Sequence, residues 1–277
     1  MTSKSTRVGF IGIGNQGEPM AARIAAAGFP LTVWARRPEA MDVMAPEVRR
    51  AVSPADVAVH SDIVCICVFT ASDVAQVLFG PSGLAEGAEP GTRILIHSTL
   101  APAEVIEIAR RGRERGLVVI DAPVSGGRIV AQQGGMTVML GGSIEDCDAV
   151  REVLAAHASK IVRVGEVGAG QRIKLINNTL MTAHFGIAAS ALAISDEFGI
   201  DQDVLFDVLT SSSGRSLAME SLARAGTVAA VANSQAYPTL SKDVSLLAES
   251  VADPTRSTLL NVAMAFVDDM TSLRGSP

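Results

Sequence analysis

The chain has 277 residues, of which 48% are hydrophobic and 19% charged, and its formal net charge is -6. The length exceeds one average domain and predicts two. The acidic balance argues against a general nucleic-acid binder, which gains affinity from a basic face. No run reaches the roughly 18 apolar residues of a membrane helix, and the start MTSKSTRVGFIG lacks the apolar stretch of a signal peptide. We therefore expect a cytoplasmic protein without nucleic-acid or membrane partners.

The first part of the chain alternates short apolar runs with helical segments. The runs lie at 7–13, 30–35, 63–69, 93–99, 117–123, 136–142 and 160–165. Continuous apolar strands separated by helices are typical of a mainly parallel sheet that is covered on both faces. The last strands have shorter connections, which fits an antiparallel edge. Residues 1–165 are therefore predicted to form an α/β domain.

The character of the sequence changes after Gly170. Between Gln171 and Phe198 little except Gly186 interrupts a helix. A helix of about 28 residues would be about 40 Å long, which is too long for one small domain and predicts a helix that joins two. The remainder has helical periodicity and no convincing strand. Residues 166–277 are therefore predicted to hold this interdomain helix and an all-α domain.

The cysteines and histidines do not predict a metal site. The three cysteines show neither metal-ligand spacing nor a disulfide framework, and we interpret them as structural. His97 follows a strand and could line a cleft, but a core position is the preferred interpretation. We interpret His184 as structural, and His60 and His157 as surface residues.

The segment VGFIGIGNQG at 8–17 carries the pattern G-x-G-x-x-G between a strand and a helix. The first glycine permits a tight turn, the second lets the backbone approach a pyrophosphate, and the third allows close helix–strand packing. The helix that follows directs its positive end at the phosphates. In the first βαβ unit the pattern predicts a dinucleotide site formed by Gly12, Ile13, Gly14, Asn15, Gln16 and Gly17.

The end of the second strand bears on the choice of cofactor. An acid about 20 residues beyond the glycines would hold a ribose 2′-hydroxyl. This chain has Ala35 there, followed by Arg36 and Arg37, and two guanidiniums suit a 2′-phosphate. Glu39 could pair with one of them, and a solvated basic loop is the alternative. We predict NADP (NADPH) in preference to NAD.

Two further segments are ambiguous when taken alone. In DAPVSGG at 121–127, Ser125, Gly126 and Gly127 can offer several donors to a small anion, or can form only a turn. In GAGQRIKLINN at 168–178, Lys174 is a lone cation in an apolar run, either on the wet edge of a helix or in a catalytic role. Asn178 follows at the i+4 position and shares its helix face.

Together these segments resemble the β-hydroxyacid dehydrogenase family, which includes 3-hydroxyisobutyrate dehydrogenase. The resemblance runs in order from about residue 7 to 250 and rests also on VLFGPSG (77–83), HSTLAP (97–102) and SKDVSLLAES (241–250). It implies a Rossmann-type doubly wound sheet, a long interdomain helix and an all-α C-terminal domain that forms a homodimer or homotetramer. The implied reaction is the reversible oxidation of a small anionic β-hydroxy acid to a semialdehyde or ketone with NAD(P).

The resemblance also assigns roles to single residues. Lys174 matches the catalytic lysine, Asn178 an asparagine that orients the substrate, and Lys242 a lysine near nicotinamide and substrate. The substrate-carboxylate loop matches Ser125, Gly126 and Gly127, and the cofactor contacts at two strand ends match Val68, Phe69, Thr70 and Thr99.

Three alternatives share parts of this pattern. A 6-phosphogluconate-type enzyme is much longer and carries a histidine where this chain has Gln171. An imine reductase usually replaces the lysine that is kept here. A non-catalytic NADP-binding regulatory protein has no need to combine Lys174, Asn178, Ser125 and Lys242. The exact substrate depends on the C-terminal domain, where Arg215 is either a contact for a second anionic group or a solvated loop arginine.

Overall fold

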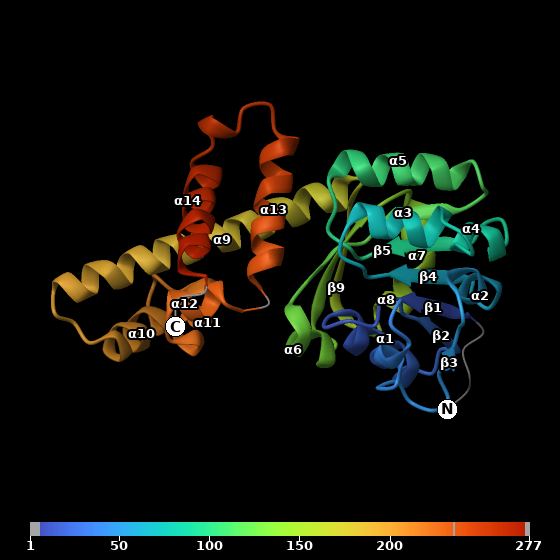
Figure 1. The fold of residues 1–277 in the computed structure, drawn as a ribbon, viewed down its shortest axis with the longest axis horizontal. Helices are drawn as coiled ribbons and strands as arrows, with labels where there is room; N and C mark the ends of the chain where they lie inside the picture. Colours follow the sequence, from blue (N-terminus) through green and yellow to red (C-terminus); the bar gives the residue numbers. More distant parts are fainter. Residues whose placement is uncertain (1–5, 235, 275–277) are drawn as a thin grey trace. The chain divides into compact units, whose positions relative to one another are not determined.

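A computed structural model describes residues 6–234 and 236–274, and its chain divides into two compact units that meet in sequence at Lys174 and Leu175 (Figure 1). The first unit is α/β and the second is helical, as the sequence predicts. Helix α9 (Ala169–Glu197) begins in the first unit and continues in the second.

The first unit is built on one mixed sheet with the strand order β3-β2-β1-β4-β5-β6-β8-β7, and β9 pairs with β8. All seven predicted runs form strands. Two further strands of two residues each, β3 and β7, were not predicted. The strands are β1 (Val8–Ile11), β2 (Leu31–Trp34), β3 (Arg49–Arg50), β4 (Ile63–Ile66), β5 (Arg93–Ile96), β6 (Val118–Asp121), β7 (Val124–Ser125), β8 (Met136–Gly141) and β9 (Ala158–Gly165).

The direction of the strands fixes where a ligand can bind. Strands β1 to β6 are all parallel to one another, β8 runs antiparallel to β6 and β7, and β9 is parallel to β8. The predicted antiparallel edge is therefore confirmed. Because β1 lies between β2 and β4, the strand order reverses there, and ligands of open α/β sheets bind at the carboxyl ends of the strands at such a point.

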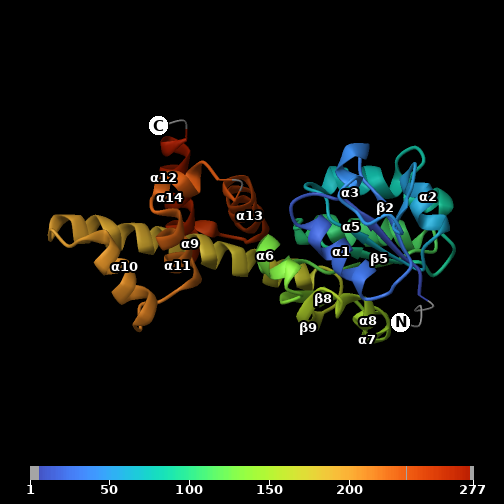
Figure 2. The same ribbon diagram turned by 90° about the horizontal axis from the view of Figure 1, so that it is seen from below.

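Alternate residues of the strands enter two hydrophobic cores on opposite faces of the sheet, because side chains alternate along a strand. Phe10 packs on one face with residues of α1 and α8, and its neighbour Ile11 packs on the other face with residues of α2, α3 and α5. These helices surround the sheet of the first unit (Figures 1 and 2). The helices of this unit are α1 (Gly17–Ala26), α2 (Pro54–Val59), α3 (Ala71–Phe79), α4 (Leu84–Gly87), α5 (Pro102–Arg113), α6 (Gly127–Gln132), α7 (Ile144–Ala149) and α8 (Arg151–Leu154), with a 3₁₀ turn at Pro38–Met41.

The expectation that His157 lies on the surface is wrong. Its side chain is 0% exposed and meets His97 edge to face, with ring centroids 5.6 Å apart. The preferred core position of His97 is confirmed, since this ring is buried, stacks on Phe10 and bonds through Nδ1 to the Ala122 carbonyl at 2.7 Å. The sequence gives no sign of this, because His157 is buried by packing between segments that are distant along the chain.

The second unit continues α9 and adds only helices in its described part. Gly186 in α9 permits close approach of α14, because a Cβ there would lie 3.1 Å from Cβ of Phe266. Phe185 stacks on the same Phe266 with centroids 5.9 Å apart. The helices that follow are α10 (Gln202–Ser211), α11 (Leu217–Ala225), α12 (Val228–Ala232), α13 (Tyr237–Ser250) and α14 (Thr258–Leu273), with a 3₁₀ turn at Pro254–Arg256.

Candidate active site

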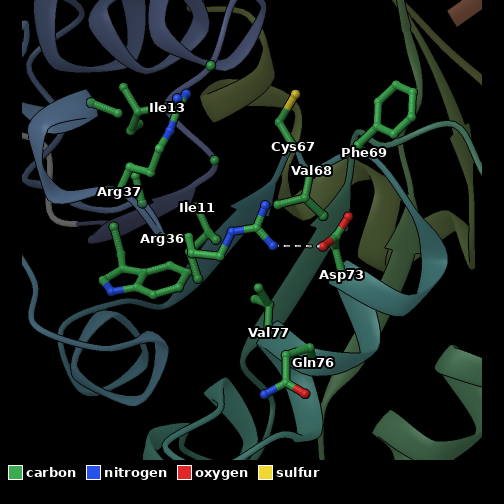
Figure 3. A pocket seen from close by; sticks show the side chains of 15 residues that line it. Ile11, Ile13, Arg36, Arg37, Cys67, Val68, Phe69, Asp73, Gln76 and Val77 are labelled. Atoms are coloured by element: carbon green, nitrogen blue, oxygen red, sulfur yellow. Dashed lines mark hydrogen bonds and ion pairs between the residues drawn. The ribbon is translucent and has the colours of Figure 1, made fainter. Parts of the chain in front are cut away.

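A cavity of about 340 Å³ opens at the carboxyl ends of β1, β2 and β4, where the strand order reverses (Figure 3). It lies wholly within the first unit. Its lining is Ile11, Gly12, Ile13, Gly14, Trp34, Ala35, Arg36, Arg37, Ala40, Cys67, Val68, Phe69, Asp73, Gln76 and Val77.

The three glycines of the loop after β1 are required for different reasons. Gly12 has φ +98°, and a Cβ there would lie 2.1 Å from the carbonyl oxygen of Cys67. A Cβ on Gly17 would lie 1.9 Å from the carbonyl oxygen of Gly12. Gly14 has no atom within 4 Å of its Cβ position, so its backbone faces open space. Gly12 therefore closes the turn against the residue after β4, and Gly17 packs the start of α1 against Gly12. Gly14 leaves room for a ligand, which fits a dinucleotide pyrophosphate at the start of α1.

The predicted residues after β2 line the same cavity. Ala35, Arg36 and Arg37 follow Trp34, and Arg36 projects into the opening with its side chain 85% exposed. Its Nη1 lies 3.4 Å from Oδ1 of Asp73, so the carboxylate seen beside this guanidinium comes from α3 and not from Glu39 (Figure 3). Two arginines here fit a 2′-phosphate.

Among the predicted contacts at the end of β4, Val68 and Phe69 line the cavity and Thr70 does not. Thr70 is the N-cap of α3. Its Oγ1 accepts a hydrogen bond from the Asp73 amide at 3.0 Å and donates to Oδ2 of Asp73 at 2.7 Å. The pattern T-x-x-D is a capping signal that sequence reasoning missed, and it places the Asp73 carboxylate at the cavity.

The loop after β5 that carries Thr99 is tied to the start of α9 by one buried amide. Gln171 accepts a hydrogen bond from the Leu100 amide at 3.0 Å through Oε1 and donates through Nε2 to the Ser98 carbonyl at 2.9 Å. The Ser98 hydroxyl accepts from the Val68 amide at 3.0 Å. The loops after β4 and β5 are thereby held in register with the helix that bears Lys174.

The segment DAPVSGG forms a strand end followed by a tight turn. Strand β7 ends at Ser125, Gly126 has φ +142° and Gly127 has φ +70° as it opens α6. A Cβ on Gly126 would lie 2.7 Å from Cγ1 of Val130, so a side chain is excluded by both conformation and space. Ser125 is half-buried and both glycines are exposed. The turn therefore presents a hydroxyl and accessible backbone, as binding of a small anion requires.

A buried carboxylate fixes the start of α9 against the strand that leads into this turn. Asp121, at the end of β6, accepts hydrogen bonds from the amides of Gly168 at 2.8 Å and Gln171 at 2.9 Å. Burial raises the pKa of Asp121 to about 6, and the bonds from backbone amides oppose that rise. A Cβ on Gly170 would lie 2.4 Å from the Met139 carbonyl oxygen, so the start of α9 requires glycine at this position.

Lys174 follows Gln171 by three residues on this anchored first turn. Its side chain is buried, with 8% of the residue exposed. A lysine on the wet edge of a helix would be largely exposed, so the solvated interpretation is wrong for this position.

In the second unit, Asn178 and Lys242 meet at one carboxylate. Nδ2 of Asn178 donates to Oδ2 of Asp243 at 2.5 Å, and Nζ of Lys242 lies 3.7 Å from Oδ1 of the same side chain. Asp243 is fully buried. Sequence reasoning named both of its partners and missed Asp243 itself, although the Lys-Asp pair in SKDVSLLAES was the available signal.

Two classes of site find no support in the described ranges. No group of three or more histidine, cysteine or acidic side chains there is placed to hold a metal ion. None of the helices combines the length and the apolar character that crossing a membrane requires.

Two family models match consecutive parts of the chain. Residues 7–165 match the NAD binding domain of 6-phosphogluconate dehydrogenase. Residues 168–272 match the model described as NAD-binding of NADP-dependent 3-hydroxyisobutyrate dehydrogenase.

Individual proteins agree with these models. The chain is 37% identical to L-threonate dehydrogenase of Cupriavidus necator over 78% of this chain and 73% of that protein. It is 35% identical to human mitochondrial 3-hydroxyisobutyrate dehydrogenase over 77% of this chain and 64% of that protein. The crystal structure of a 3-hydroxyisobutyrate dehydrogenase from Salmonella typhimurium superposes with a TM-score of 0.84 at 31% identity, covering 97% of this chain and 94% of the other.

Proposed function

Because the chain belongs to the β-hydroxyacid dehydrogenase family and is an NAD(P)-binding oxidoreductase acting on a CH–OH group, we propose that it interconverts a small β-hydroxy acid and its semialdehyde or keto form with NADP, using Lys174 as general acid and base. The observation that carries this proposal is the burial of Lys174 near the start of α9. Hydrogen bonds of Asp121 and Gln171 hold this end of the helix against the strand ends beside the cofactor cavity.

In the proposed reduction, NADPH supplies the hydride to the carbonyl carbon of the substrate. The Lys174 ammonium donates a proton to the oxygen that becomes the alcohol. In the oxidation direction the neutral amine accepts that proton. Ser125 and the amides of Gly126 and Gly127 hold the substrate carboxylate and thereby limit its orientations. From the second unit, Asn178 and Lys242 serve as further substrate and cofactor contacts.

The preference for NADP over NAD rests on Arg36 and Arg37 at the rim of the cavity. No acid follows β2 at the position that would bond a ribose 2′-hydroxyl, since Ala35 occupies it. Asp73 keeps Arg36 at the cavity, where its guanidinium can exchange that carboxylate for a phosphate.

A further part of the proposal is that two copies associate through α9 in a cytoplasmic homodimer, from which a tetramer can be built. Exposed apolar side chains recur along one side of this helix and at the residue that follows it, namely Ile176, Leu180, Ile187, Ile194 and Phe198. Their spacing of four, seven, seven and four residues keeps them within one narrow stripe. A continuous apolar stripe of this kind marks a surface that another protein covers.

The test combines binding with turnover. Trp34, the single tryptophan, lines the cavity, so its fluorescence reports titration with NADPH and NADH. Turnover is then measured with 3-hydroxyisobutyrate, L-threonate and related β-hydroxy acids, with short semialdehydes and with cyclic imines, following NADPH absorbance. We expect NADPH binding and turnover of at least one β-hydroxy acid. Binding without turnover across the panel would favour a regulatory protein, and turnover of cyclic imines alone would favour an imine reductase.

A further inference from the structure

Arg128 connects two loops to which the proposed function gives different ligands. It is the second residue of α6 and directly follows Gly126 and Gly127. Its Nη1 donates to the carbonyl oxygen of Asn15 at 3.0 Å, and its Nη2 forms an ion pair with Glu18. Asn15 lies in the glycine loop and Glu18 in the first turn of α1. One guanidinium therefore bridges the substrate turn and the cofactor loop within the first unit.

This bridge is specific in geometry. The planar guanidinium directs separate N–H donors at two acceptors, a neutral carbonyl and a carboxylate, which a lysine cannot reproduce with the same fixed fork. The Arg128 side chain is 41% exposed, so the ion pair alone contributes little to stability. Its second contact, the hydrogen bond to the Asn15 carbonyl, ties Arg128 to the loop on which Gly14 faces open space.

A second arginine of α1 lies beside the other end of α6. Arg23, near the end of α1, donates through Nε to the Ala156 carbonyl at 3.0 Å. Its guanidinium lies against the turn after α6, since a Cβ on Gly134 would be 2.7 Å from Nη2 of Arg23. The far end of α6 therefore lies next to α1, and Arg128 is the hydrogen-bonded connection at the end that carries the substrate turn.

We propose that Arg128 is a positioning residue that transmits occupancy of the glycine loop to the Ser125-Gly126-Gly127 turn, so that NADPH and the substrate carboxylate bind with positive coupling. The proposal rests on the proposed function, because it takes the glycine loop as the cofactor site and the turn as the carboxylate site. An ordered Asn15 loop holds Arg128, and Arg128 holds the first residues of α6 in the conformation that binds the carboxylate. Coupling is reciprocal, so the substrate must tighten NADPH binding by the same factor.

The first measurement needs no substrate. Hydrogen–deuterium exchange of the full chain is followed with and without NADPH in peptides that cover 11–18 and 122–133. In the wild type we expect NADPH to slow exchange in both segments. In Arg128→Gln we expect slower exchange in the glycine loop only, and in Arg128→Lys an intermediate result.

The second measurement gives the coupling factor itself. The Kd of NADPH is measured by Trp34 fluorescence with and without a saturating β-hydroxy acid that the enzyme turns over, which forms a non-reacting complex because both partners are reduced. We expect NADPH binding about fivefold tighter or more with the acid present in the wild type, which is the usual lower range of such coupling, and a factor near one in Arg128→Gln.

Arg151→Gln is the matched control. Arg151 lies at the start of the short helix α8, where it also bonds one carboxylate and one carbonyl, those of Asp148 and Ile161. Its loss should leave both measurements as in the wild type. Equal protection of the turn, or an equal coupling factor, in Arg128→Gln and wild type would overturn the proposal. If NADPH, and NADH in a parallel exchange run, protect neither segment of the wild type, the proposed function fails and the coupling proposal fails with it. Protection confined to the glycine loop contradicts the coupling alone.

Discussion

Lys174 is buried, with 8% of the residue exposed, near the start of α9, which the side chains of Asp121 and Gln171 anchor to the sheet. A proton donor in such a place is expected to act in the reaction and not in folding. Lys174→Ala should lower kcat by about 10²- to 10⁴-fold, which is the usual contribution of a general acid or base. The Kd of NADPH from Trp34 fluorescence should change by less than about twofold, because the lysine acts on the substrate oxygen.

The matched control for this variant is Lys160→Ala. Lys160 is an exposed lysine of β9 in the same unit. Its removal should leave kcat unchanged. Wild-type turnover by Lys174→Ala would exclude the lysine as general acid.

The two arginines after β2 are expected to contribute unequally. Arg36 already has Asp73 as a partner, so a phosphate must compete with that carboxylate. Arg37→Ala should therefore raise the Kd of NADPH by about 10- to 100-fold, the equivalent of one charge-assisted hydrogen bond. NADH lacks the 2′-phosphate and should bind within about twofold of wild type. Equal losses for both cofactors, measured by the same titration, would show that Arg37 does not contact the phosphate.

At the scale of residues, the sequence predicts a site well when the residues that form it lie close together along the chain. Gly12, Gly14 and Gly17 are identified because each is required by a backbone within the same short loop. Asp73 and Asp243 were missed because their roles depend on partners that folding brings to them, Arg36 in one case and Asn178 in the other. The local patterns T-x-x-D and Lys-Asp mark these two positions, but they do not reveal which distant side chain each carboxylate contacts.

The apolar stripe of α9 gives the prediction at the scale of elements. A carboxylate in the middle of a buried helix interface must lose its hydration without a partner, which is costly. Ile187→Glu should therefore convert a dimer into monomers, as measured by analytical ultracentrifugation, and should leave the far-ultraviolet circular dichroism unchanged because Ile187 is 57% exposed within the chain.

Ala193→Glu serves as the control on the same helix. Ala193 is also exposed, and at 100° per residue it lies well away from the stripe. The same charge there should leave the association state intact. If both variants sediment as the wild type does, α9 is not the interface.

Elements were predictable where periodicity extends over several residues. The run from Gln171 to Phe198 predicts a helix, and α9 occupies Ala169–Glu197. The strands β3 and β7 contain two residues each, Arg49–Arg50 and Val124–Ser125, and no alternation can be recognised over that length. They exist because β2 and β8 offer free backbone donors and acceptors beside them.

For the molecule as a whole, the buried histidine pair predicts loss of stability in mild acid. Burial lowers the pKa of His97 to about 4 and that of His157 to about 3, from an ordinary value of 6.5. As the pH falls from 6.5 towards 4, the unfolded chain binds a proton at each of these two histidines that the folded chain does not bind. The free energy of unfolding therefore decreases. Asp121, with its pKa raised from 3.8 to about 6, opposes this below pH 6, because there the folded chain holds the extra proton. Stability is therefore greatest above pH 6.5 and decreases below it.

Urea unfolding between pH 4.5 and 7.5 measures this dependence, and Trp34 fluorescence reports the unit that contains both histidines. His157→Leu should reduce the slope by about one proton, or about 1.4 kcal/mol per pH unit. Neither ring nitrogen of His157 has a hydrogen-bond partner within the described residues, so the substitution removes no such bond. His60→Gln, at a position with a 43% exposed side chain, should keep the wild-type slope. An unchanged slope in His157→Leu would exclude this residue as the source.

The division of the chain into units was the less predictable feature at this scale. The change of composition after Gly170 marks where helices replace strands. Asp121 and the loop after β5, however, bind the first turn of α9 to the sheet. The boundary between the two compact units therefore lies inside the helix, between Lys174 and Leu175. These bonds join residues about 50 and 70 positions apart, a relation that composition does not contain.

The anchored start of α9 has a practical consequence for chimeric enzymes. A hybrid that takes its cofactor half from this chain and its helical half from a relative should be joined after Lys174, inside the helix, and not at residue 165 where the last strand ends. With a junction at 165, Gly168 and Gln171, which bond Asp121 and the loop that carries Ser98, would come from the other protein. The natural exchange point of this architecture is therefore in the middle of a helical turn.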